Sequence, residues 1–181
     1  MIKFNYNDGG RAAAGFKGNT GDCVTRAIAI VTGKPYREVY DELNVLCKKK
    51  RTYEVEISGR TYINYTRSAA RTGVHKKIYH PYLIGLGFEW IPTMGIGTGC
   101  KVHLKAEELP SGKIICRVSK HLTAVIDGVV NDTWNPAREV HETGYKDGEQ
   151  YSAIRERCVY GYYRLREVKP KPVKATVRVA R

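Results

Sequence analysis

Three residue types that can together activate a thiol occur in this sequence, at Cys23, His121 and Asp132. A thiol becomes a strong nucleophile only after losing its proton, which an adjacent imidazole can accept. A carboxylate on the far side of the imidazole holds the ring in the productive orientation. The three residues therefore predict a cysteine hydrolase that attacks a carbonyl carbon, a reaction for which we expect no metal and no organic cofactor.

The cysteine is expected to begin a helix. Apolar residues follow the spacing of one helix face and are followed by Gly33, a typical stop signal. Thr20 or Asp22 could cap the start, which places Cys23 in the first turn. There the unpaired backbone N–H groups and the helix dipole stabilise a thiolate. The apolar positions of this helix are Val24, Ala27, Ile28 and Val31.

The histidine and the aspartate are expected to meet across a β-hairpin. Two apolar runs flank Asp127-Gly128, a signal for a two-residue turn. In that register His121 and Asp132 are diagonal neighbours on one face, because side chains alternate along a strand. Asn131 then points to the other face, so the register selects Asp132 as the partner of the histidine.

This arrangement resembles the papain-like cysteine peptidases, in which a cysteine begins the first core helix and a histidine and an Asx residue lie on later strands. Asp132-Thr133-Trp134 resembles the family's Asn-Ser-Trp, in which the tryptophan shields the Asx–histidine bond. Asp22-Cys23, leading into VTRAIAIVTGK, is similar to the peptidase domains of bacteriocin-exporting transporters. The whole chain is also similar to small uncharacterised proteins of phages and bacteria.

The resemblance implies an oxyanion hole next to the thiol. The family has a glutamine several residues before the cysteine, and this sequence has none there. Asn19, four residues before Cys23, is the nearest substitute, and the Cys23 backbone N–H would be the second donor.

The remaining pattern predicts an α+β fold, with the cysteine-bearing helix packed on a mostly antiparallel sheet that carries the histidine and the aspartate. Residues 1–168 are expected to form one papain-like domain, and 169–181 a basic, flexible tail. Residues 93–100, with three glycines, read as a loop. The other expected elements are a helix from Pro35, a hairpin of 52–57 and 60–65, a short helix from Pro81 to Gly87, and strands at 113–119, 121–126, 129–134 and 157–164.

Charge and cysteine content suggest partners and a compartment. The net charge of +13 favours an acidic partner, either nucleic acid or an anionic polymer. We expect no membrane association, since no apolar run approaches about 18 residues. Five cysteines without a pairing pattern or an export signal predict reduced thiols in the cytoplasm of a bacterial or phage-infected cell. Cys100 and His103 have zinc-ligand spacing, but no second pair completes a site. Inert burial is expected of Cys47, Cys116 and Cys158.

Three functions fit these residues. The first is cleavage of a peptide or isopeptide bond in a protein or peptide substrate. The second is an amidase or endopeptidase acting on peptidoglycan with the same chemistry, where a basic surface would suit an anionic wall. The third is a non-catalytic papain-like protein, with phage origin as one option, that binds or inhibits host machinery or nucleic acid. Labelling by a thiol-reactive probe separates the enzymes from the binder.

Overall fold

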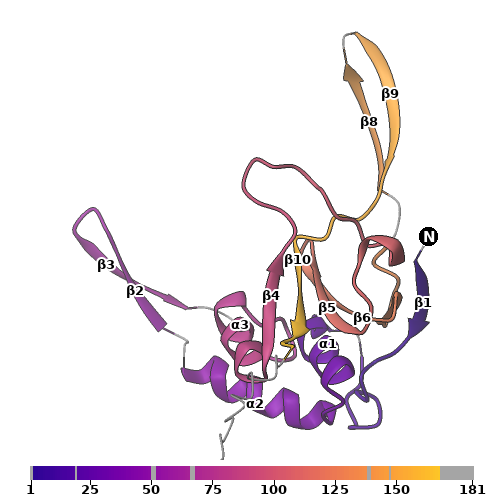
Figure 1. Cartoon of the computed structure of the whole chain (residues 1–181). Coiled ribbons are helices and arrows are strands. Elements are labelled where there is room, and N and C mark those ends of the chain that lie inside the picture. Colours follow the sequence, from indigo (N-terminus) through magenta and orange to yellow (C-terminus); the bar gives the residue numbers. More distant parts are fainter. Residues whose placement is uncertain are drawn as a thin grey trace, which may run out of the picture.

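The framework of the protein is a mixed six-stranded sheet with the order β1-β7-β6-β5-β10-β4 (Figure 1). A computed structural model describes residues 2–18, 20–49, 52–65, 68–137, 140–146 and 148–167. The strands pair antiparallel except β1 and β7, which run parallel. Their bounds are β1 Lys3–Tyr6, β4 Phe88–Pro92, β5 Lys113–Val118, β6 His121–Ile126, β7 Val129–Asp132 and β10 Gly161–Leu165.

The helices are α1 (Cys23–Thr32), α2 (Tyr36–Lys49) and α3 (Lys76–Gly85), with a short 3₁₀ helix η1 at Ala106–Glu108. The expected end of α1 is confirmed. Gly33 has a φ of 73° and donates its N–H to the Ala29 carbonyl at 2.9 Å, a left-handed cap that glycine adopts without strain. Helix α1 packs against β6, and α2 packs against α1.

Apolar side chains cover both faces of the sheet. Leu122 and Ala124 of β6 belong to the cluster shared with the helices, whereas Val125 and Val130 belong to the cluster on the other face. The α+β class expected from the sequence is therefore observed, with α1 on a sheet whose strands include those of the histidine and the aspartate. Ile28 of α1 is fully buried, and its truncation to Ala should lower the free energy of unfolding by about 2–5 kcal/mol.

The predicted start of the short helix, Pro81 to Gly87, is wrong. Helix α3 begins at Lys76, and Pro81 lies inside it. The side chain of His75, at the N-cap, accepts a hydrogen bond from the Lys77 N–H at 3.3 Å, so the cap is a histidine rather than one of the usual cap residues. The proline misled the prediction because it favours a first helical turn.

Two hairpins form separate two-stranded sheets that extend away from the main body (Figure 1). The first, β2 (Thr52–Ile57) and β3 (Arg60–Tyr65), matches the expected strands and turns at Ser58-Gly59. The second, β8 (Val140–Lys146) and β9 (Glu149–Arg155), was not expected. Strand β7 is shorter than expected and ends at Asp132, and β10 begins only at Gly161.

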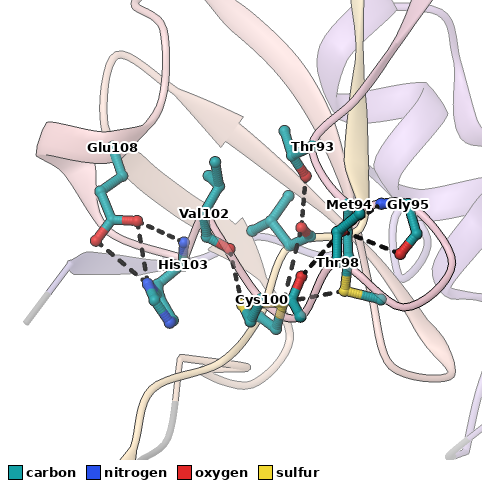
Figure 2. Close-up of a disulfide and its surroundings, with 11 residues drawn as sticks. Thr93, Met94, Gly95, Thr98, Cys100, Val102, His103 and Glu108 are labelled. Atoms are coloured by element: carbon teal, nitrogen blue, oxygen red, sulfur yellow. Dashed lines mark hydrogen bonds and ion pairs between the residues drawn. A yellow bond between two sulfur atoms is a disulfide. The ribbon is translucent and has the colours of Figure 1, made fainter.

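A disulfide joins Cys100 to Cys158, which corrects the expectation of five reduced thiols (Figure 2). The fold brings the two segments together: Val159 donates its N–H to the Val102 carbonyl at 2.9 Å, and Leu104 donates to the Arg157 carbonyl at 2.8 Å. The sequence concealed the pair because 58 positions separate the cysteines and spacing alone does not define connectivity. Free thiols remain at Cys23, Cys47 and Cys116, and burial of the last two is confirmed.

The expected tail, 169–181, lies outside the described residues. Within the residues that are described, no helix has the length and apolar character needed to cross a bilayer.

Candidate active site

Cys23 is the first residue of α1 and is half-buried. Asp22 occupies the N-cap position, but its carboxylate does not cap the helix. It instead forms ion pairs with Arg26 and, at 3.0 Å, with Arg11, and accepts a hydrogen bond from the Tyr36 hydroxyl at 2.5 Å. Thr20, the other expected cap, donates its hydroxyl proton to the Arg71 carbonyl.

The expected register of the β6–β7 hairpin is confirmed. Ile126 pairs with Val129, and Ala124 with Asn131. Asp127 and Gly128 have φ values of 47° and 73°, the positive pair that a type I′ turn requires. Asn131 points away from the histidine, because its Oδ1 accepts a hydrogen bond from the Asn5 side chain of β1 at 3.0 Å.

His121 is held by Asp132. The ring Nε2 lies 2.7 Å from Asp132 Oδ2, and the histidine is 9% exposed. The Trp134 ring covers the imidazole, with ring centroids 4.9 Å apart. With Nε2 engaged by the carboxylate, Nδ1 is the nitrogen left to hydrogen-bond the Cys23 sulfur.

The cysteine and the histidine meet at the end of the sheet rather than across it. Leu122 and Ala124 face the helices, so strict alternation assigns His121 and Asp132 to the opposite face. However, His121 is the first residue of β6 and Asp132 the last of β7. At that strand end the sheet no longer separates the two side chains from the start of α1.

The pair is arranged to exist as thiolate and imidazolium. Burial raises the pKa of the Cys23 thiol, but the hydrogen bond and charge of His121, a backbone hydrogen bond with Leu122 and the charge of Arg26 lower it more, so the net pKa falls below its usual value. Burial lowers the pKa of His121, but the hydrogen bonds and charges of Asp132 and Cys23 raise it to about 9. Both shifts act in the direction of proton transfer from the sulfur to the imidazole.

Asp132 is kept ionised although it is buried. Burial raises its pKa, but the hydrogen bond and charge of His121 and the Thr133 N–H, which donates to Oδ1 at 2.8 Å, bring the net pKa below its usual value. Oδ1 also lies 3.3 Å from Arg26 Nη2. Arg26 thus joins the carboxylate of Asp132 to that of Asp22 behind the cysteine.

Sequence reasoning missed Arg26. The residue follows Asp22 by four positions and Cys23 by three, so all three lie on one side of α1. An arginine between the apolar positions of a buried helix is the signal that could have revealed it, because a buried charge requires partners.

The catalytic candidates open into a cleft of about 590 Å³. Cys23, His121 and Trp134 line it together with Tyr79, whose hydroxyl is kept protonated because burial and the Cys23 charge raise its pKa despite the opposing charge of Arg117. Further lining residues are Thr20, Gly21, Arg26, Thr72, Lys76, Arg117 and Lys120. Asn19, the expected oxyanion-hole residue, lies outside the described residues.

A separate group could bind a metal ion by residue type alone. His103, Glu108 and Glu156 offer ligand atoms within 4.8 Å of one another. Figure 2 shows the first two of these residues in the surroundings of the disulfide. The Lys105 ammonium lies 2.5 Å from Glu156 and 3.7 Å from Glu108, so a cation of the protein already pairs with both carboxylates. The geometry therefore favours a structural ion-pair cluster over a metal site.

Comparisons with protein-family models, with curated proteins and with solved structures found no match to this chain.

Proposed function

We propose that the protein is a papain-like cysteine hydrolase that cleaves a peptide or isopeptide bond. The observation that carries this proposal is the chain of contacts from Asp132 through His121 to Cys23, which begins at the 2.7 Å bond and ends at a thiol in a cleft. A buried thiol with a purely structural role would need neither a lowered pKa nor an imidazole held by a carboxylate.

The reaction proceeds through an acyl-enzyme. The Cys23 thiolate attacks the carbonyl carbon of the substrate, and the Cys23 backbone N–H, free at the first position of a helix, donates to the oxyanion. Asn19 remains our candidate for a second donor. The His121 imidazolium protonates the leaving amine as the C–N bond breaks, leaving a thioester on Cys23. A water molecule, deprotonated by His121, then releases the acid and restores the thiol.

Other features of the molecule are consistent with the proposal. Trp134 packs against the His121 ring, with ring centroids 4.9 Å apart, where it would shield the His121–Asp132 bond from water. The net charge of the chain also suits an anionic substrate, which keeps wall peptides as a second candidate with identical chemistry. The proposed setting is a bacterial or phage-infected cell, and the Cys100–Cys158 disulfide favours a compartment in which thiols are oxidised.

Turnover of protein and peptidoglycan substrates tests the proposal. The wild-type protein is incubated with a denatured bacterial lysate and with purified peptidoglycan, and new amino termini are identified by mass spectrometry. We expect new termini with wild type and with Cys47→Ala, which removes a buried free thiol, and none with Cys23→Ala. Equal products from wild type and Cys23→Ala would contradict the proposal, as would the absence of products from every substrate.

A further inference from the structure

Two hollows meet at a pair of basic side chains beside the candidate nucleophile. The catalytic cleft is joined by a second hollow of about 340 Å³, and Lys76 and Arg117 line both. The wall of the second hollow comes from β4, the 93–100 loop and the residue before β10, namely Trp90, Pro92, Met94, Gly95, Ile96 and Tyr160. A substrate lying over Cys23 would extend into this second hollow past both cations.

Aromatic rings, not carboxylates, hold the two cations. Lys76 Nζ lies 5.0 Å from the centroid of the Trp90 ring, and Arg117 Cζ lies 5.8 Å from that of Tyr160. The Trp90 ring packs closely on the backbone at Gly161, since a Cβ there would lie only 2.3 Å from the ring. Contacts of this kind place a cation without neutralising it.

The charge of the pair is left for a ligand. Within the described residues neither Lys76 nor Arg117 forms an ion pair, and no acidic side chain lines either hollow. Two basic residues elsewhere differ, because carboxylates pair with them: Lys34 binds Glu38 and Glu42, and Arg164 binds Glu89 at 2.7 Å. Exposed Lys120, beside His121, adds a third positive charge to the cleft. Unpaired cations in a recess focus a positive potential that attracts carboxylates.

We propose that Lys76 and Arg117 form a specificity subsite that selects peptide substrates with an acidic side chain close to the scissile bond. The inference rests on the proposed function, because it assigns the subsite to the substrate of Cys23. A guanidinium accepts a carboxylate in a two-point contact, and the lysine adds a mobile point charge. A carboxylate on the substrate would fill the space beside the cations that the protein's own acids leave open.

The preference can be measured without a known substrate, by comparing alkylation of Cys23 with anionic iodoacetate and neutral iodoacetamide. Both reagents form the same S–C bond and release iodide, so their rate ratio, normalised to that of N-acetylcysteine, reports the potential at the sulfur. We expect the normalised ratio of the iodoacetate rate to the iodoacetamide rate to be about 3 to 10 at low salt, as one or two screened charges in a cleft would produce. The ratio should fall as salt is added.

Matched variants locate the effect. Arg117→Gln and Lys76→Gln should each reduce the ratio by about 2- to 5-fold while the iodoacetamide rate stays within a factor of about two, which also shows that the site is folded. Lys113→Gln, at the other end of the strand that carries Arg117, removes the same charge from an exposed position and should leave the ratio unchanged. A ratio near one in wild type, or equal losses in all three variants, would overturn the subsite.

The failures of the two proposals are distinguishable. Normal iodoacetamide reactivity with no preference for iodoacetate would contradict the subsite alone. A Cys23 that reacts slowly with both reagents would contradict the proposed hydrolase and the subsite with it. A short single-stranded DNA that protects Cys23 at lower concentration than a Glu-rich peptide of equal charge would also overturn the peptide subsite, in favour of a nucleic-acid surface.

Discussion

Asp132 uses its two carboxylate oxygens for different partners. Oδ2 bonds to His121, and Oδ1 bonds to the Thr133 N–H and lies near Arg26. The carboxylate therefore cannot rotate away from the imidazole without losing contacts at its other oxygen. Orientation of the histidine is set by this arrangement as well as by the charge of the thiolate.

Replacement of Asp132 should reduce activity, whereas replacement of its neighbour Asn131 should mainly reduce stability. Asp132→Ala removes the orienting group, and we expect kcat/KM to fall by about 10²- to 10³-fold, less than the ~10⁴-fold of serine proteases because a thiolate–imidazolium pair partly orients itself. Asn131→Ala removes the bond from Asn5 and should cost about 1 kcal/mol of stability with activity within about twofold. A greater loss of turnover in folded Asn131→Ala than in Asp132→Ala would contradict the assignment.

Arg26 should be a stability residue as well as a neighbour of the thiol. Arg26→Gln leaves two buried carboxylates, Asp22 and Asp132, without their shared cation. We expect the free energy of unfolding, measured in urea, to fall by about 3–5 kcal/mol. Arg37→Gln is the matched control, because it breaks an exposed Arg–Asp pair at the same four-residue spacing and should cost at most about 1 kcal/mol. Similar losses in the two variants would show that the buried network contributes little.

At the scale of elements, local signals predicted what local interactions determine. The spacing of apolar residues and Gly33 gave α1, and Asp127-Gly128 gave the register that joins His121 to Asp132. The features that were not predicted depend on contacts between residues distant in sequence. Strand β1 forms only by pairing in parallel with β7, which follows more than a hundred residues later. Arg26 became a site residue because the fold brings Asp132 to it.

The Asp127-Gly128 turn can be tested against a similar turn elsewhere. Gly128→Ala forces a side chain into a φ of 73° and within 3.0 Å of Ala106, so we expect a loss of about 1–2 kcal/mol and slower alkylation of Cys23. Gly148→Ala, in the β8–β9 turn, has a similar φ of 85° with open space around it and should lose stability without slowing alkylation. Equal alkylation rates in the two variants would indicate that the hairpin register does not position His121.

For the molecule as a whole, the net charge follows from the composition, but the location of the charge does not. The cleft collects Lys76, Arg117 and Lys120 from a helix, a strand and a turn, and no sequence spacing connects them. The disulfide is a second long-range feature of this kind. The expected fold class was reached because layer packing follows from the order of elements, whereas the walls of the cleft depend on where those elements meet.

The Cys100–Cys158 disulfide should stabilise the region around the 93–100 loop. Peptide mapping under non-reducing conditions should find these two cysteines linked and the other three free. Cys100→Ser should lower the free energy of unfolding by about 2–4 kcal/mol, because the bond closes a long loop in the unfolded chain. Labelling of all five cysteines in the unreduced, unfolded protein would show that the bond does not form.

The central claim is that His121 activates Cys23, and the pH dependence of Cys23 alkylation by iodoacetamide tests it most directly. In wild type the rate should reach its plateau at a lower pH than that of an ordinary thiol with a pKa of ~8.5, since His121 lowers the pKa of Cys23. A second change should follow near pH 9, where the imidazolium, whose pKa is raised to about 9, loses its proton. In His121→Gln burial acts unopposed by the imidazolium, so the plateau should vanish and Cys23 should titrate at or above ~8.5. Identical profiles for wild type and His121→Gln would contradict the account.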